Sequence, residues 1–161
     1  MAIDVRLSAF ITRIQGRIGF CHHATYTLFA SSYRGEHQVK DGCQSAEFGA
    51  LLQHHRKYGH EFDATNYIPP NLYDVFGFYV PGRDTIVHSA MVVDVTPPVQ
   101  LAECDNLSGH VYIHTLQQVL EAEKRCEIRV FPAWYIEALT EGMEAAQRLK
   151  IDLLSMLEGQ V

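Results

Sequence analysis

Residues 13–33 read RIQGRIGFCHHATYTLFASSY, a segment in which two glycines lead into a predicted helix. The helix is expected over residues 21–33, because its apolar positions fall on one stripe. Those positions are Tyr26, Phe29, Ala30 and Tyr33. Cys21 begins the helix, where the helix dipole favours a negative charge. Three roles are therefore open for Cys21: a small buried residue, a metal ligand beside the two histidines that follow it, or a nucleophile.

The sequence that follows this segment predicts a further helix, then several strands, and later a helix at the C-terminal end. A second helix is expected at about residues 45–58, with Glu47 near its positive end. Short β-branched and aromatic stretches follow, separated by proline and glycine, which is typical of antiparallel strands. They are YDVFGFYV, DTIVHSAMVVDV, VQLAEC and HVYIH.

The last third of the chain predicts a short helix, a strand and a long helix. Thr115 is a suitable N-cap for TLQQVLEAEKR, CEIRVF is a strand, and Pro132 begins an amphipathic C-terminal helix. We therefore predict an α+β fold, a single domain over residues 1–161, with helices packed against one face of a mostly antiparallel sheet.

Composition excludes several classes of function. The chain has 161 residues, 47% of them hydrophobic and 20% charged, with a formal net charge of -6 and no cluster of lysine and arginine. This composition argues against a nucleic-acid partner or a membrane surface. The charged N-terminus is unlike a signal peptide, so we expect a cytoplasmic protein, or one exported without a Sec-type signal peptide. Four scattered cysteines indicate free thiols, and no cofactor is expected.

His88 is the histidine that stands out. It lies inside TIVHSAMVV, which is apolar on both faces, and an imidazole there needs a partner. A core histidine bonded to a carbonyl is one interpretation. The other is a catalytic imidazole that deprotonates Cys21.

Two acids and one amide complete the predicted site. In a hairpin centred on Pro97 and Pro98, either Glu103 or Asp105 could orient His88, since both point to the same face of their strand. The register slightly favours Asp105. The Cys21 N–H and the amide of Gln15, near the flexible glycines Gly16 and Gly19, would stabilise an oxyanion.

The segment QGRIGFC, residues 15–21, resembles the Gln-Gly-x-x-Gly-x-Cys segment of papain-like cysteine proteases. The order of the later motifs is similar to two small bacterial branches of that superfamily, over roughly residues 15–131. In the peptidase domains that cut double-glycine leaders, VHSAMVVDVTPPVQLAECDNLSG would be the His strand and an Asp-x-x-x-Gly turn, here Asp105 to Gly109. In NlpC-type cell-wall peptidases, Glu103 would take the third catalytic place. His22 departs from the small residue usual in these families.

The resemblance implies a papain-like fold and a cysteine hydrolase, either a peptidase or an amidase, that acts on a peptide or another amide. Glutamine deamidation and acyl transfer could use the same triad. A small protein of this kind would suit a bacterial effector or an intracellular peptidase. The C-terminal helix could also pair copies of the chain.

Three other interpretations compete with this one. Cys43 also begins a helix, but its upstream Gln38 is one residue too close to match the motif. A metal-binding protein is a second alternative, although neighbouring histidines on a helix point about 100° apart. Its candidate ligands are Cys21, His22 and His23; His54, His55 and His60; and His110 and His114. A third is an interaction protein without catalysis, for which Cys21 would be unreactive.

Overall fold

The computed structural model describes residues 3–15, 20–36, 42–63, 65 and 68–159, with only the backbone of residues 42–45. Its helices are α1 (Val5–Ile14), α2 (Cys21–Tyr33), α3 (Gly42–His54), the 3-10 turn η1 (Arg56–Tyr58), α4 (Leu116–Ala122) and α5 (Ala133–Glu158). Its strands are β1 (His60–Glu61), β2 (Val75–Tyr79), β3 (Ile86–Asp94), β4 (Gln100–Cys104), β5 (Val111–Thr115) and β6 (Glu127–Phe131). The predicted α+β class is confirmed, and α2 has the bounds that the sequence predicts.

The sheet of the described residues has six strands in the order β1-β6-β2-β3-β4-β5, and every pairing is antiparallel. Strands β2 to β5 lie beside one another in chain order, as expected for sequential strands. β6 lies between β1 and β2 instead of beyond β5. The five residues of β2 are all buried, so their backbone groups need a partner strand on each side. β3 and β6 supply those partners.

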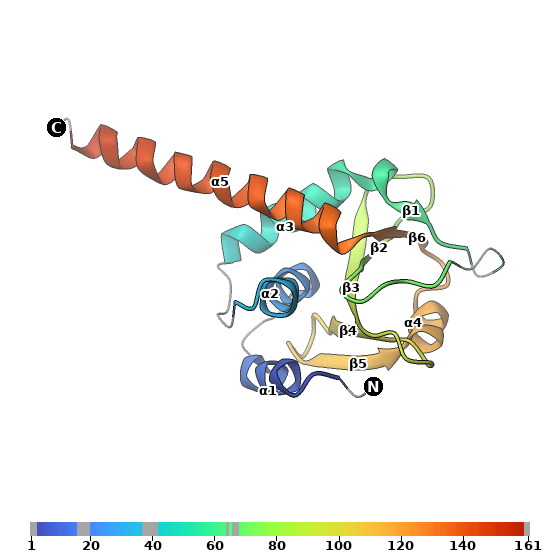
Figure 1. The fold of residues 1–161 in the computed structure, drawn as a ribbon. Coiled ribbons are helices and arrows are strands. Elements are labelled where there is room, and N and C mark those ends of the chain that lie inside the picture. The colour runs from blue at the N-terminus through green and yellow to red at the C-terminus, as the bar shows by residue number, and fades with distance from the viewer. Residues whose placement is uncertain (1–2, 16–19, 37–41, 64, 66–67, 160–161) are drawn as a thin grey trace.

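Helices cover both faces of the sheet, which corrects the prediction that they pack on one face (Figure 1). The larger core lies between one face and α1, α2, α3 and α5. α4 packs on the opposite face, where Leu116 and Val119 join a second cluster that includes Phe76 and Phe78. Thr115 caps α4 as predicted, in a capping box with Gln118.

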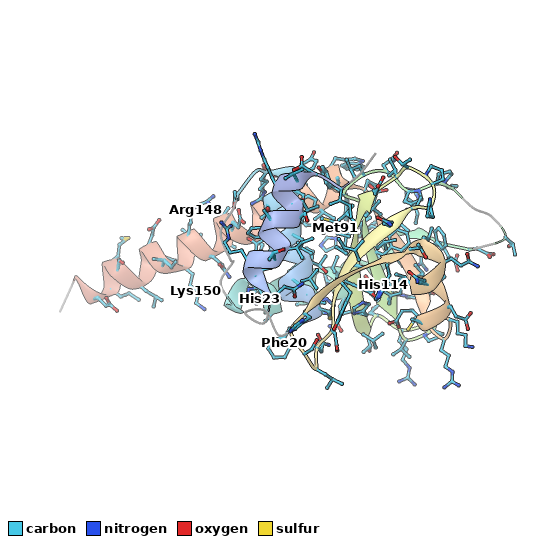
Figure 2. All side chains as sticks on the ribbon, turned by 90° about the horizontal axis from the view of Figure 1, so that it is seen from below. Phe20, His23, Met91, His114, Arg148 and Lys150 are labelled. Carbon is cyan, nitrogen blue, oxygen red and sulfur yellow. The ribbon has the colours of Figure 1, made fainter. Side chains whose placement is uncertain are left out.

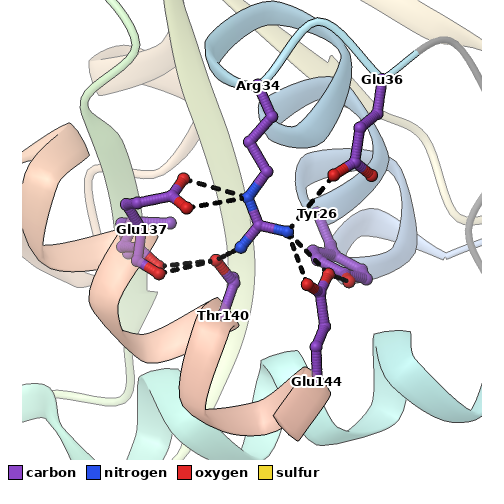
Figure 3. A network of polar contacts seen from close by, with 7 residues as sticks. Tyr26, Arg34, Glu36, Glu137, Thr140 and Glu144 are labelled. Carbon is purple, nitrogen blue, oxygen red and sulfur yellow. Dashed lines mark hydrogen bonds and ion pairs between the residues drawn. The ribbon is translucent and has the colours of Figure 1, made fainter. Parts of the chain in front are cut away.

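α5 is joined to the body by its first half only. Ile136, Thr140 and Met143 are its buried residues, and Arg34 of α2 binds Glu137 and Glu144 beside them (Figure 3). The second half projects from the molecule (Figure 1), and Arg148 and Lys150 mark it in Figure 2. Its exposed apolar side chains are Leu149, Ile151, Leu153, Leu154, Met156 and Leu157. Pairing of copies through this helix stays a prediction.

Among the described residues, no helix combines the length and the apolar character needed to cross a membrane.

Candidate active site

Cys21 is placed by the start of α2. The preceding residue, Phe20, is extended and offers no side-chain cap, so the first N–H groups of the helix need acceptors from elsewhere. The Cys21 N–H donates to Oδ1 of Asn106 at 2.6 Å, across 85 positions of sequence. The Cys21 side chain is only 4% exposed. The start of a helix is the local condition that the sequence predicted for a nucleophile, whereas burial alone would also suit a small core residue.

His88 lies against the thiol and is held by a carboxylate. Its Nε2 is 2.8 Å from Oε2 of Glu103, and its ring packs against Phe78 with 5.4 Å between ring centroids. The other carboxylate oxygen of Glu103 is 2.8 Å from Nδ1 of His114 on β5. Cys21, His88 and Glu103 thus form one connected group, drawn from α2, β3 and β4.

The electrostatics of this group favour a thiolate and an imidazolium. Burial raises the pKa of the Cys21 thiol, but hydrogen bonds from His22 and His88 outweigh it and lower that pKa to about 5. Burial lowers the pKa of His88, whereas hydrogen bonds to Cys21 and Glu103 raise it to about 10. Glu103 is also buried, which raises its pKa, yet hydrogen bonds from His88 and His114 give a net lowering. An opposite charge in contact explains each net shift.

The structure corrects the preference for Asp105 as the acid that orients His88. The carboxylate of Asp105 serves its own turn: Oδ1 accepts from the Leu107 N–H at 2.9 Å, and Oδ2 accepts from the Ser108 hydroxyl at 3.1 Å. Its main chain closes the same turn with Gly109 and His110. Asp105 is exposed at the end of the β4–β5 hairpin, whereas Glu103 contacts His88. Glu103 lies in β4, whereas Asp105 follows the last residue of that strand, so the two acids do not share a strand face as predicted and the turn decides between them.

Gln15 does not reach the thiol with its amide in this structure. Its Nε2 donates to the Val111 carbonyl at 2.8 Å, and its Oε1 accepts from the Val111 N–H at 2.7 Å. This paired bond joins the end of α1 to the start of β5. The predicted oxyanion role of Gln15 is therefore replaced by a structural one, and Gly16 and Gly19 lie outside the described residues.

Two side chains at the site were not predicted as members of it. The first is Asn106, whose carboxamide lies against both the N–H and the sulfur of Cys21, with 3.9 Å between Nδ2 and Sγ. The second is His22, which hydrogen-bonds the Cys21 thiol. The sequence has His22 where papain-like proteases usually have a small residue, and this difference is the one signal that could have pointed to His22 as part of the site. No local pattern marks Asn106.

The orientation of the His22 ring follows from a chain of hydroxyl bonds. Thr25 donates its hydroxyl proton to the Cys21 carbonyl at 2.9 Å, and Ser89 donates its own to Thr25 at 2.9 Å. Each hydroxyl has a single proton, so Nδ1 of His22, 2.8 Å from the Ser89 oxygen, must donate to it. This chain fixes the tautomer of His22 and ties the ring to β3.

Gly49 of α3 makes room for the same ring, and its replacement is a testable prediction. A Cβ at position 49 would lie 2.8 Å from Cδ2 of His22, too close for an undisturbed ring. Gly49→Ala is therefore expected to displace His22, to slow alkylation of Cys21 at pH 6, and to cost about 1–3 kcal/mol of stability. Gly142→Ala on α5 is the control, because its Cβ would meet no atom within 4 Å. Equal alkylation rates in the two variants would contradict this packing.

Several histidines named by the metal-binding interpretation contact other side chains, and the competing Cys43 lies in α3. The rings of His54 and His55 contact each other, and His55 bonds the hydroxyl of Tyr135, while His114 bonds Glu103. Within the part of the chain that the structure describes, no three His, Cys, Asp or Glu side chains are arranged to hold a metal ion. α3 begins at Gly42, beside the competitor Cys43, whose side chain lies outside the description.

Comparison of the chain with protein-family models, with curated proteins and with solved structures finds no match.

Proposed function

We propose that this protein is a thiol amide hydrolase in which Cys21 is the nucleophile, His88 the general acid and base, and Glu103 the group that orients His88. The observation that carries the proposal is the 2.8 Å contact between His88 and Glu103, on the imidazole that helps to lower the pKa of the buried Cys21 thiol. A nucleophile, a base and a third group that orients the base form the arrangement that covalent acyl chemistry requires. A papain-like fold and an effector role remain part of this proposal.

The proposed reaction begins from the thiolate and imidazolium pair. The Cys21 sulfur attacks the carbonyl carbon of an amide and forms a C–S bond, while the carbonyl π electrons move to its oxygen beside the Cys21 N–H. His88 then gives its proton to the leaving nitrogen as the C–N bond breaks. Water, deprotonated by His88, attacks the thioester and releases the acid, and the thiolate forms again. Glu103 holds the imidazole in place through both steps.

The test is alkylation of the native thiols with iodoacetamide across a pH series, followed by mass spectrometry. Cys21 is expected to react at full rate from about pH 6, because its pKa is about 5. Cys104 and Cys126 serve as internal references, since burial raises the pKa of both, to about 11 for Cys104. If Cys21 reacts no faster at pH 6 than these thiols or Cys43, the proposal fails.

Glu103→Gln is expected to lower the upper pH limit of activity. The glutamine keeps the size of the side chain but removes the charge that raises the pKa of His88, so the imidazolium is lost at a lower pH. The alkaline limb of the alkylation and turnover profiles should move down by about one pH unit or more. Glu121→Gln is the control, because that side chain is 76% exposed on α4. Unchanged profiles in Glu103→Gln would remove Glu103 from the triad.

A further inference from the structure

The carboxamide of Asn106 lies where an amide substrate must lie. Its oxygen accepts from the Cys21 N–H at 2.6 Å, and its nitrogen is 3.9 Å from the Cys21 sulfur. In the proposed reaction, the substrate carbonyl oxygen needs that same N–H, and its carbon and nitrogen must lie beside that same sulfur. Asn106 therefore presents to the nucleophile a primary carboxamide in the orientation of a bound substrate.

The turn that carries Asn106 is built to aim this side chain. The Asp105 carboxylate accepts from the Leu107 N–H and the Ser108 hydroxyl. Gly109, which has a left-handed backbone with φ of 70°, donates its N–H to the Asp105 carbonyl. The residues on either side of Asn106 are exposed, and Leu107 is 97% exposed. The carboxamide is thus held by a surface turn and by its bonds to Cys21, so a substrate amide can exchange with it by rotation of one exposed residue.

A cleft opens at the same place. It has a volume of about 500 Å³, and its lining includes His88, Glu103, Asn106, Tyr112 and His114. This lining is mostly polar and offers both hydrogen-bond donors and acceptors, which suits a carboxamide. Cys21 is almost fully buried and is not part of this lining, so a substrate reaches the sulfur at the place that the Asn106 carboxamide now occupies. The nitrogen that lies there now, Nδ2 of Asn106, carries only hydrogens, so the contact that the structure shows is one with a primary carboxamide.

We propose that the substrate of this site is a primary carboxamide, the side chain of a glutamine or asparagine residue, and that Asn106 occupies the substrate position in the resting protein. The inference rests on the proposed function. Cys21 attacks the carboxamide carbon, His88 protonates the NH₂ group, and ammonia leaves as the thioester forms. Water then cleaves the thioester to a carboxylic acid and restores the thiolate. The net reaction consumes one water and releases one ammonia, with no change in oxidation state.

The experiment compares a primary amide with its N-methyl analogue in the same peptide, and adds a mixture of cellular proteins, all under the same conditions. The unmodified protein is incubated with acetyl-Ala-Gln-Ala, with its side-chain N-methyl analogue, and with a whole-cell lysate, both digested and intact. Ammonia and methylamine are measured directly, and deamidated residues and new chain ends are found by mass spectrometry. Cys21→Ala gives the background. Asn106→Ala tests the resting contact, with Leu107→Ala as the neighbouring control.

The expected result is release of ammonia and deamidated glutamine or asparagine above the Cys21→Ala background, with at least tenfold less methylamine from the analogue. Asn106→Ala is expected to lower KM several-fold, because it removes the competing carboxamide, and Leu107→Ala to leave it unchanged. Equal methylamine release, cleavage of peptide bonds without deamidation, or no turnover by a protein whose Cys21 still alkylates rapidly at pH 6 would overturn the carboxamide proposal. Slow alkylation of Cys21 would instead overturn the proposed function.

Discussion

Replacing His88 with alanine is expected to slow alkylation of Cys21 at pH 6 by about tenfold, because a rise of about two units from the present pKa of about 5 lowers the thiolate fraction at that pH from about 0.9 to about 0.09. The reason is that burial and His88 shift the pKa of the Cys21 thiol in opposite directions. The pKa of the thiol is lowered to about 5 in spite of burial, and His88 supplies one of the hydrogen bonds that lower it. Without that imidazole, burial still disfavours the charged sulfur, so the pKa of Cys21 rises and its thiolate is lost from the acid side.

The pH profile separates this effect from unfolding. In the unmodified protein, the thiolate is present above about pH 5 and the imidazolium below about pH 10, so turnover should be bell-shaped between those limits. His88→Ala should lose amide turnover by about 10²–10⁴-fold, because no group remains to protonate the leaving nitrogen. His55→Ala is the matched control, since His55 bonds Tyr135 instead of the thiol. A similar loss in both variants would point to damage to the fold.

The Cys21 and His88 pair could be predicted because each residue carries a local signal. Cys21 begins a helix that follows an extended Phe20, and His88 is the one ionisable side chain within an apolar strand. The same kind of local signal predicted Thr115 as the cap of α4 and Pro132 near the start of α5, where it is the N-cap. For Cys21, Thr115 and Pro132, side-chain chemistry at the start of a helix decides the structure, so the local sequence is enough to predict it.

Other features depend on contacts between distant parts of the chain. Asn106 caps α2 from 85 positions away, and β6 enters the sheet beside β2, so no local pattern could have marked either placement. Two signals were available but not used. The turn-forming oxygens of Asp105, with Ser108 and Gly109 following, could have separated it from Glu103. α1 was not predicted, although its buried residues Leu7, Phe10, Ile11 and Ile14 follow helical spacing.

Arg34 attaches α5 to the body of the molecule. Arg34, at the end of α2, has a side chain only 11% exposed, and its guanidinium contacts Glu137 at 3.0 Å and Glu144 at 2.7 Å (Figure 3). It also bonds Thr140, while Glu144 accepts from the Tyr26 hydroxyl. Both carboxylates are largely buried, with exposed fractions of 22% and 16%. One cation therefore neutralises two acids at the helix interface.

Arg34→Leu is expected to reduce the free energy of unfolding by about 3–5 kcal/mol, because it removes the guanidinium that contacts two partly buried carboxylates. Urea unfolding measures the loss. Arg148→Leu, an exposed arginine on the projecting half of α5, should change stability by no more than about 0.5 kcal/mol.

A triple variant decides whether the buried charges or the lost hydrogen bonds cause the loss of stability. Arg34→Leu combined with Glu137→Leu and Glu144→Leu removes both acids together with the guanidinium and fills the interface with apolar side chains, an exchange that is often neutral or stabilising. Most of the stability lost in Arg34→Leu should then return. If the triple variant is as unstable as Arg34→Leu alone, the hydrogen bonds to Thr140 and Tyr26 hold α5 in place, and the ion pairs do not. α5 contacts α3, and α3 packs on α2, which begins at Cys21. The alkylation rate of Cys21 in these variants therefore also shows whether the loss of stability at α5 disturbs the candidate active site.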